Sequence, residues 1–237
     1  MSIMSDLKTA LGGLNIPIDD VNLRRFSEFE GLLLEWNKKM NLTAITDSFG
    51  IMTKHFLDSL LPLTVFDIPQ GARMIDVGTG AGFPGVPIKL ARADISITLL
   101  DSLNKRIHFL DHVIAELELD GICAVHGRAE ELGRLSEWRE TFDVATSRAV
   151  ATLDMLSEFC LPFVKVGGVF LVLKSADSDD EIEAAKPIIA ELGGKIEDEF
   201  SAEVPYTDIT RKIVVVRKVS PTPERFPRSM KKIRRGG

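Results

Sequence analysis

The stretch that most constrains this chain is a glycine-rich segment that follows an apolar run and an acid, Met74-Ile75-Asp76-Val77-Gly78-Thr79-Gly80-Ala81-Gly82-Phe83-Pro84-Gly85. Four glycines fall within eight positions, a pattern that predicts a buried strand, a tight turn and the start of a helix. Glycine permits positive φ and lets a ligand approach the backbone, and a helix N-terminus offers unpaired N–H groups. We therefore interpret the segment as a ligand-binding loop and not as a plain structural turn.

Two classes of ligand suit such a loop. Residues 80–85 match the dinucleotide fingerprint G-x-G-x-x-G, but a single match of this kind is weak evidence. When the count starts at Gly78, the third glycine position is Phe83 and the match fails. The carboxylate of Asp76 would repel a pyrophosphate, whereas it suits a ligand with an ammonium and a sulfonium. The loop therefore favours S-adenosylmethionine, with a dinucleotide as the alternative.

Length and composition set the class of protein. The 237 residues, 45% of them hydrophobic, allow one domain with an extension. No apolar run approaches the ~18–20 residues of a membrane span, and residues 1–13 lack the pattern of a signal peptide. Cys123 and Cys160 form no disulfide framework, and His108 and His112 lack the glutamate and the third ligand of a helical zinc site. We expect a cytoplasmic monomer without a metal.

Residues 1–70 are predicted to form a helical cap on a larger domain. Apolar residues recur at helical spacing from Asp19 to Trp36, with Asp19 or Asp20 as the N-cap. Residues 37–46 are expected to interrupt this helix, and a second helix is expected from about Ser48. The resulting division is a cap over residues 1–70, a catalytic domain over 71–219 and a basic tail over 220–237.

After the glycine loop, strand and helix patterns alternate, which predicts an α/β fold with a mostly parallel sheet. Ligands of such sheets bind beyond the carboxyl ends of the strands. The residues expected at those ends are Gly78, Asp101, Glu130, Arg148 and Lys174. Asp101 follows Gly78 by 23 residues, close to the ~20 typical of an acid that binds ribose hydroxyls. Residues 195–204 and 211–217 are joined by a short loop, so they form an antiparallel hairpin.

The charge is unevenly distributed. Residues 220–237 have a net charge of +5. Since the whole chain has a net charge of −6, the remaining residues have a net charge of −11. An acidic body with a basic tail permits a local nucleic-acid contact. Three further cations, Lys105, Arg106 and Arg128, lie close behind the strand ends and favour a polyanionic substrate. The tail's prolines argue against an autonomous helix there, so we expect an extended arm that contacts nucleic acid and leaves ligand binding at the glycine loop unaffected.

Motifs spread over nearly the whole chain resemble the bacterial small-subunit ribosomal RNA guanine-N7 methyltransferase G family, also called glucose-inhibited division protein B. The matching segments are residues 36–45 (WNKKMNLTAI), 55–60 (HFLDSL), 76–85 (DVGTGAGFPG), 99–102 (LLDS) with Lys105 and Arg106, 128–130 (RAE), 147–149 (SRA) and 226–228 (FPR). The chain departs from the family pattern at Ser175, where glycine is usual, and in the tail after Arg228.

The resemblance implies a class I, Rossmann-like methyltransferase fold with a seven-stranded sheet, the cofactor S-adenosyl-L-methionine and methylation of a guanine in 16S ribosomal RNA, either as naked RNA or within the small subunit. Together with the loop, it implies the cofactor-binding residues Asp76, Gly78, Gly80, Phe83, Asp101, Ala129, Glu130 and Arg148. Arg148 and Lys174 are the candidates for positioning the base or a nearby phosphate.

Methylation of guanine N7 removes no proton, so the chemistry requires alignment and no general base. The sequence agrees, because it has neither the Asp-Pro-Pro-Tyr type of motif of many amino-methylating enzymes nor a Pro-Cys nucleophile. Two alternatives stay open at this point. One is a dinucleotide-dependent reductase, and the other is an RNA-binding module that keeps the fold without the activity.

Overall fold

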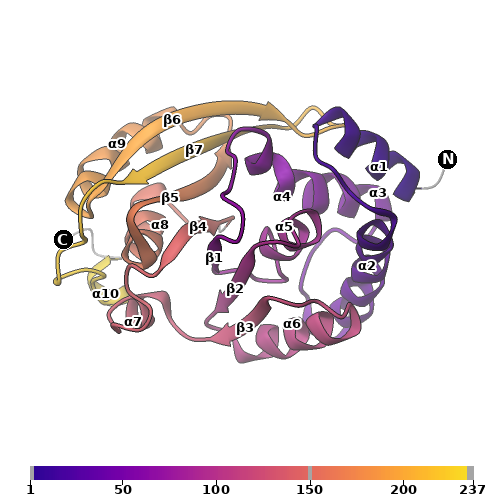
Figure 1. Ribbon diagram of the computed structural model, residues 1–237, viewed down its shortest axis with the longest axis horizontal. Helices are drawn as coiled ribbons and strands as arrows, with labels where there is room; N and C mark the ends of the chain where they lie inside the picture. The colour runs from indigo at the N-terminus through magenta and orange to yellow at the C-terminus, as the bar shows by residue number, and fades with distance from the viewer. Residues whose placement is uncertain (1–2, 149–150, 234–237) are drawn as a thin grey trace.

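The structure is a computed structural model that describes residues 3–148 and 151–233. Its centre is one seven-stranded sheet in the order β3-β2-β1-β4-β5-β7-β6 (Figure 1). The strands are β1 (Arg73–Val77), β2 (Ser96–Asp101), β3 (Ile122–His126), β4 (Phe142–Ser147), β5 (Val164–Ser175), β6 (Gly194–Glu203) and β7 (Thr210–Lys218). β1 to β5 pair in parallel, and β7 runs antiparallel to both β5 and β6. The predicted mostly parallel sheet with an antiparallel hairpin is confirmed.

Helices cover both faces of this sheet (Figure 1). They are α1 (Ile3–Gly13), α2 (Asp20–Met40), α3 (Ser48–Ile51), α4 (Asp58–Leu60), α5 (Gly85–Ala91), α6 (Asn104–Glu116), α7 (Ala129–Leu132), α8 (Leu153–Cys160), α9 (Asp179–Glu191) and α10 (Met230–Ile233). A π-helical segment (Met52–Leu57) joins α3 to α4, and 3₁₀ turns follow α4 (Leu61–Thr64) and α8 (Leu161–Phe163).

The core lies in two layers because successive strand side chains point to opposite faces. On β7, Ile213 and Val215 belong to the layer beneath the cap, α5 and α6, whereas Val214 and Val216 belong to the layer beneath α8 and α9. All four side chains are buried. The cap shares its layer with the sheet, so the apolar stripe of α2 and one face of the sheet form a continuous core.

The cap differs from expectation in three details. α2 begins after the N-cap Asp19, as predicted, but it continues through residues 37–40 and ends at Met40, with Asn41 as the C-cap at φ 50°. Asn37 supports this end, because its side chain bonds both backbone groups of Thr43. The helix predicted from Ser48 is present and capped by Asp47, but its middle is a π-helix. α1 was not predicted.

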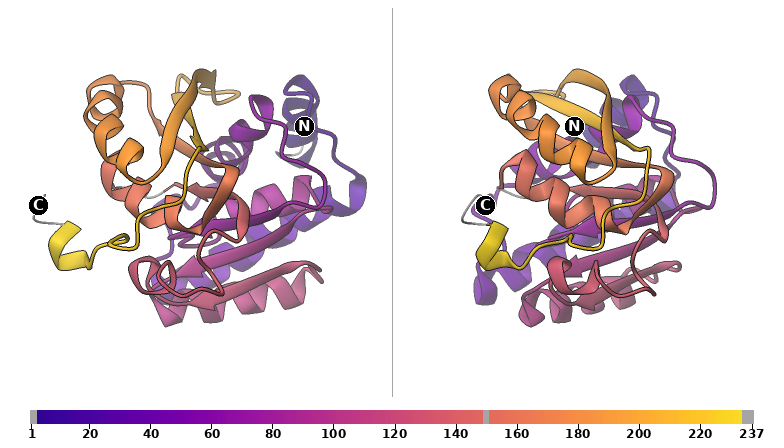
Figure 2. Two further views of the ribbon diagram at one scale, coloured as in Figure 1. Left: turned by 60° about the vertical axis from the view of Figure 1, so that its left-hand side comes forward. Right: turned by 90° about the vertical axis from the view of Figure 1, so that its left-hand side faces the viewer.

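The C-terminal tail is not a plain extended arm. It leaves β7, crosses the molecule beside α8 and ends in the short helix α10 (Figure 2). Phe226 is buried in the layer beneath α8, which explains why the chain is held against the body there. The expectation of an extended arm was wrong for residues 230–233, which form a helix that packs on the body through the buried Ile233. Arg234 and Arg235 of the predicted basic tail lie outside the described residues, as does Ala149.

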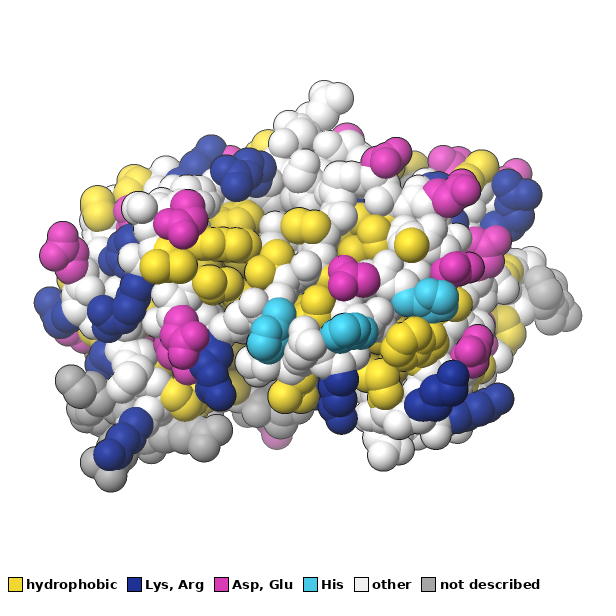
Figure 3. All heavy atoms as spheres, turned by 90° about the horizontal axis from the view of Figure 1, so that it is seen from below, with side chains coloured by type: hydrophobic (Ala, Val, Ile, Leu, Met, Phe, Trp, Pro, Cys, Tyr) yellow, Lys and Arg dark blue, Asp and Glu magenta, His cyan; other side chains and the backbone are white. Residues whose placement is uncertain are grey.

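The face of the molecule seen in Figure 3 carries no extended basic field for a polyanion among the described residues. Figure 3 shows that the face seen from below Figure 1 mixes cations, acids and apolar side chains, without a field of one sign. No helix in the described part of the chain is long and apolar enough to cross a membrane.

Candidate functional site

The glycine loop is braced from beneath by Asp76. The Oδ2 atom of this buried carboxylate accepts hydrogen bonds from Thr79 Oγ1 at 2.6 Å and from the backbone N of Gly85 at 2.9 Å. A Cβ at Gly85 would lie 2.3 Å from Leu99 Cδ2, so only glycine allows this approach. Asp76 thus holds the turn between β1 and α5 and does not line a pocket itself.

One carboxylate oxygen of Asp76 has no hydrogen-bond partner in the described part of the chain. Its Oδ1 is the single buried side-chain oxygen or nitrogen without a hydrogen-bond partner among the residues described. Burial, opposed by the hydrogen bonds from Thr79 and Gly85, raises the pKa of Asp76 to about 6. A carboxylate with this free acceptor is a site that a cationic group could stabilise.

Asp101 ends β2 next to this loop. Its Oδ2 accepts hydrogen bonds from the backbone N of Gly80 at 2.9 Å and from Arg106 Nη1 at 3.1 Å, and its Oδ1 accepts one from Leu103 N at 2.9 Å. Gly78 has a φ of 74°, and its N–H bonds Leu100 O at 2.8 Å. The loop and the end of β2 are therefore one rigid unit, which supports the predicted pairing of the glycines with Asp101.

A pocket of about 160 Å³, here called the acid-lined pocket, opens beside this unit. Four of the predicted cofactor residues line it: Gly78, Asp101, Ala129 and Glu130. Its apolar lining includes Leu100, Leu156, Phe159 and Met230. Glu130 is buried at the start of α7, where its Oε1 lies 3.7 Å from the exposed Arg128. The structure therefore brings the second and third strand ends together, as the sequence predicted.

The other predicted cofactor residues lie elsewhere. Asp76 and Gly80 belong to the framework of the loop, as described above. The Phe83 ring is buried against the cap, 4.5 Å from the His55 ring and 5.4 Å from the Phe29 ring. The Arg148 guanidinium lies 5.0 Å from the centre of the Phe83 ring and lines a second pocket.

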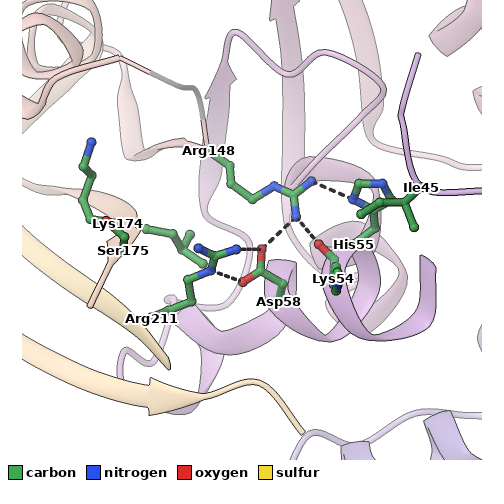
Figure 4. A pocket seen from close by; sticks show the side chains of 9 residues that line it. Ile45, Lys54, His55, Asp58, Arg148, Lys174, Ser175 and Arg211 are labelled. Carbon is green, nitrogen blue, oxygen red and sulfur yellow. Dashed lines mark hydrogen bonds and ion pairs between the residues drawn. The ribbon is translucent and has the colours of Figure 1, made fainter. Parts of the chain in front are cut away.

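This second pocket, here called the cationic pocket, has a volume of about 450 Å³ (Figure 4). It is lined by Ile45, Lys54, His55, Asp58, Arg148, Leu173, Lys174, Ser175 and Arg211. Four of these side chains are cations and one is a carboxylate. The pocket thus lies between the cap and the ends of β4 and β5, and it suits a phosphate or another anion.

Asp58 organises the cationic pocket. Its carboxylate is buried and accepts hydrogen bonds from Arg148 Nη1 at 2.9 Å and Arg211 Nε at 2.6 Å (Figure 4). Arg148 also bonds the Lys54 carbonyl at 2.9 Å and His55 Nδ1 at 3.2 Å. One acid therefore holds two guanidinium groups in place.

His55 is neutral in this setting. Burial, followed by the charge of Arg148, lowers the pKa of His55 from 6.5 to about 4. Its Nε2 lies 2.7 Å from Thr43 Oγ1, and its ring stacks on Phe83. Both ring nitrogens have partners, so His55 serves as a structural residue of the pocket wall.

Lys174 is tied to the opposite side of the pocket. Its ammonium lies 2.7 Å from Glu181 and donates a hydrogen bond to Ala151 O at 2.9 Å. In Figure 4 the side chain extends away from Arg148 and Arg211. Ala151 lines the acid-lined pocket, so this hydrogen bond connects the two pockets.

Sequence reasoning missed Lys54, Asp58 and Arg211 as site residues. Arg211 reaches the pocket because β7 pairs antiparallel with β5, with Arg211 opposite Ser175. The sequence predicted the hairpin of β6 and β7, but it did not predict that β7 pairs with β5, which places the start of β7 at the edge where β5 ends. Two expected cations are neutralised instead, because Arg106 pairs with Asp101 and Arg128 lies beside Glu130.

The residues of the acid-lined pocket suit an adenosyl group bearing a cationic amino-acid chain. A carboxylate stands at the end of the second strand for ribose hydroxyls, and apolar side chains form a wall for a purine. Among the residues described, no cluster of three His, Cys, Asp or Glu could hold a metal.

Comparisons with solved structures place the fold. Fibrillarin of Methanococcus jannaschii, a pre-rRNA processing protein, is 18% identical with a TM-score of 0.52, over 66% of this chain and 70% of that one. Fibrillarin of Aeropyrum pernix, solved with bound S-adenosyl-L-methionine, is 15% identical with a TM-score of 0.51, over 67% and 72% of the two chains. These likenesses confirm the predicted methyltransferase fold.

Relatives in sequence are much more similar. Ribosomal RNA small subunit methyltransferase G of Alkaliphilus oremlandii is 48% identical over 96% of this chain and 95% of its own length. The protein of the same name from Lachnoclostridium phytofermentans is 46% identical over 95% of each chain. A family model described as rRNA small subunit methyltransferase G matches residues 22–202. The chain belongs to the rRNA small subunit methyltransferase G family.

Proposed function

We propose that this protein transfers a methyl group from S-adenosyl-L-methionine to N7 of a guanine in 16S ribosomal RNA. The observation that carries the proposal is the pairing of the acid-lined pocket with the cationic pocket at one edge of the sheet, joined by the hydrogen bond from Lys174 to Ala151. The first pocket suits a nucleoside with a cationic chain, and the second suits the phosphates of an RNA. A reaction between the two ligands requires this adjacency.

Within this proposal the residues have distinct roles. Asp101 and Glu130 hold the nucleoside part of the donor, Gly78 and Ala129 form the floor, and Asp76 and Gly80 hold the loop in shape. Arg148, held by Asp58, positions the guanine or its phosphate from the other pocket. Lys174 holds the segment between the two pockets in place, because its ammonium bonds the carbonyl of Ala151 and pairs with Glu181. Phe83 supports Arg148 from below and does not touch the donor.

The chemistry requires little else of the protein. The bound donor supplies a methyl group on a sulfonium, and the N7 lone pair takes it, leaving a thioether and a cationic methylated purine. No proton leaves guanine, so no side chain has to act as a base. Alignment of the acceptor with the methyl group can lower the barrier by roughly 7–11 kcal/mol. The neutral His55 and the buried Asp58 serve this alignment by holding Arg148.

The remaining parts of the proposal concern organisation. We propose a cytoplasmic monomer with a cap over residues 1–70, a catalytic domain over 71–219 and a basic tail over 220–237. The exposed cations of the tail contact the RNA. Light scattering of the purified protein tests whether it is a monomer.

The test uses tritiated S-adenosyl-L-methionine with small subunits, and separately with naked 16S RNA, from a strain that lacks the gene. We expect label in 16S RNA and chain cleavage by borohydride and aniline at one guanine, the reaction that marks N7 methylation. Labelled RNA that resists this cleavage would place the methyl group on another atom. Binding of RNA without transfer of label would instead favour a module that has the fold without the activity.

A further inference from the structure

We infer that Met230 of the C-terminal tail forms part of the donor pocket and packs against the adenosyl part of the methyl donor. The inference rests on the proposed function and extends it, since the tail was expected to serve the RNA alone. Met230 lies 129 residues after Asp101 in the sequence, yet both line the acid-lined pocket. It is half-buried there, in a wall that also contains Leu156 and Phe159 of α8.

The tail is anchored so that Met230 is presented to this wall. Two arginines that follow α7 hold its backbone from one side. Arg139 donates hydrogen bonds to the carbonyls of Thr222, Pro223 and Phe226, and Arg134 donates to those of Arg225 and Pro227. Because five of the six main-chain carbonyls in residues 222–227 accept these hydrogen bonds, the body of the protein sets the path of this segment.

The last anchor lies two residues before Met230. The carboxylate of Glu158 on α8 is buried, and it accepts hydrogen bonds from the backbone N and the guanidinium of Arg228, with Nη2 to Oε2 at 2.8 Å. A hydrogen-bonded pair with one buried partner is costly to break. This contact ties the start of α10 to the helix that supplies Leu156 and Phe159.

Besides these hydrogen bonds, an apolar contact holds the helix α10 against the body. Ile233 is buried, and it lines a neighbouring hollow between α8 and α9 with Met155 and Ile188. Residues three apart lie on the same side of a helix, so Met230 and Ile233 face the body together. One side chain enters the hollow between α8 and α9, and the other enters the acid-lined pocket.

The chemistry of the pocket indicates which part of the donor Met230 would touch. Asp101 and Glu130 provide its acidic wall, and an acid at the end of the second strand holds ribose hydroxyls. A purine attached to that ribose then extends toward Ala129, where Leu156, Phe159 and Met230 provide apolar atoms. A thioether side chain adapts its shape and packs well on aromatic rings. Met230 is therefore a binding residue for the purine.

Calorimetry on the full chain tests the inference with S-adenosyl-L-homocysteine and with adenosine as probes. We expect Met230→Ala to weaken the binding of both probes about fivefold, because the lost contact is with the part that they share. Met230→Leu, which keeps the apolar volume, should stay within about twofold of the wild type. Met230→Gln, of similar length but polar, should weaken binding like the alanine variant.

Lys231→Ala is the matched control, since it alters the exposed neighbour on the same short helix. It should leave both dissociation constants unchanged. If wild type and Met230→Ala bind both probes with equal affinity, the inference is overturned, whether or not the melting temperature falls. The tail would then have a structural role only. Failure of the wild type to bind either probe would overturn the proposed function and, with it, this inference.

Discussion

Asp58 of the cap accepts a hydrogen bond from Arg148, which follows β4, with Oδ2 to Nη1 at 2.9 Å. The same carboxylate accepts a second guanidinium, that of Arg211 at the start of β7. A segment of the cap, the end of a parallel strand and the start of an antiparallel strand thus meet at one buried acid. This contact explains how the cap contributes to the site as well as to the core.

Removal of this acid should be costly. Asp58→Ala leaves two guanidinium groups facing each other without a counter-charge, and we expect roughly 3 kcal/mol less free energy of unfolding. Urea denaturation measures this loss. The control is Asp179→Ala, which removes the exposed partner of Lys212 next to Arg211 and should cost under about 1 kcal/mol. Similar losses in the two variants would show that Asp58 is not a structural centre.

Replacing Asp101 should weaken donor binding, whereas replacing its partner Arg106 should not. A carboxylate offers about four acceptor positions, and the three present hydrogen bonds leave too few for two ribose hydroxyls. Since Arg106 is half-buried and Asp101 is buried, Arg106 is the partner that can move away when the donor binds. We expect Asp101→Ala to raise the donor dissociation constant at least tenfold, because unpaired hydroxyls cost about 1–3 kcal/mol.

Arg106→Ala, in contrast, should leave donor affinity equal to or tighter than that of the wild type. Titration calorimetry on both variants makes the comparison. Clearly weaker binding by Arg106→Ala would mean that the ion pair with Asp101 persists in the complex and supports the donor site.

Glu130 should contact the donor and not serve a surface ion pair. The carboxylate is buried and lines the acid-lined pocket, whereas its neighbour Arg128 is exposed at 3.7 Å. We expect Glu130→Gln to weaken donor binding about fivefold with little change in melting temperature, since one polar contact contributes about 1 kcal/mol. Arg128→Gln is the control and should change neither value. If both variants weaken donor binding equally, the ion pair is the functional unit.

His55 should make stability depend on pH. The unfolded chain protonates His55 near pH 6.5, but burial and Arg148 lower its folded pKa to about 4. The stability due to the neutral ring is therefore fully present above pH 6.5 and is lost as the pH falls toward 4. Between pH 7 and pH 5 the wild type should lose roughly 2 kcal/mol more than His55→Gln.

The raised pKa of Asp76 acts in the opposite direction, because stability from its protonated form is lost as the pH rises through about 6. Both proteins contain Asp76, so its contribution cancels in the difference. Chemical denaturation at the two pH values measures that difference. Parallel curves for wild type and variant would show that His55 titrates normally in the folded protein.

Lys54 should contribute to RNA binding through its charge. It is exposed at the rim of the cationic pocket, and each lost phosphate contact flattens the log–log salt dependence of binding by about 0.7–0.9. We expect Lys54→Gln to show this flatter slope and an unchanged donor affinity. Lys195→Gln, at the opposite end of the hairpin, is the control and should retain the wild-type slope. Identical slopes for the two variants would remove Lys54 from the RNA site.

The amino-acid sequence alone determined the sheet, the loop and the acidic wall of the acid-lined pocket. Strand ends in a parallel sheet share one edge, so local periodicity was enough to place Gly78, Asp101 and Glu130 together. The family motifs point to the same residues. They do not distinguish side chains that hold the loop, such as Asp76, from those that line the pocket.

Only the tertiary structure decided which distant segments complete the two pockets. Asp58 meets Arg211 across 153 positions, and Met230 lines the same pocket as Asp101, which lies 129 positions earlier in the chain. Hydrophobic periodicity reports which face of an element is buried, but it carries no information on the partner against which that face packs. Asp58, Arg211 and Met230 become part of the site through the packing of the cap, the pairing of β7 with β5 and the anchoring of the tail.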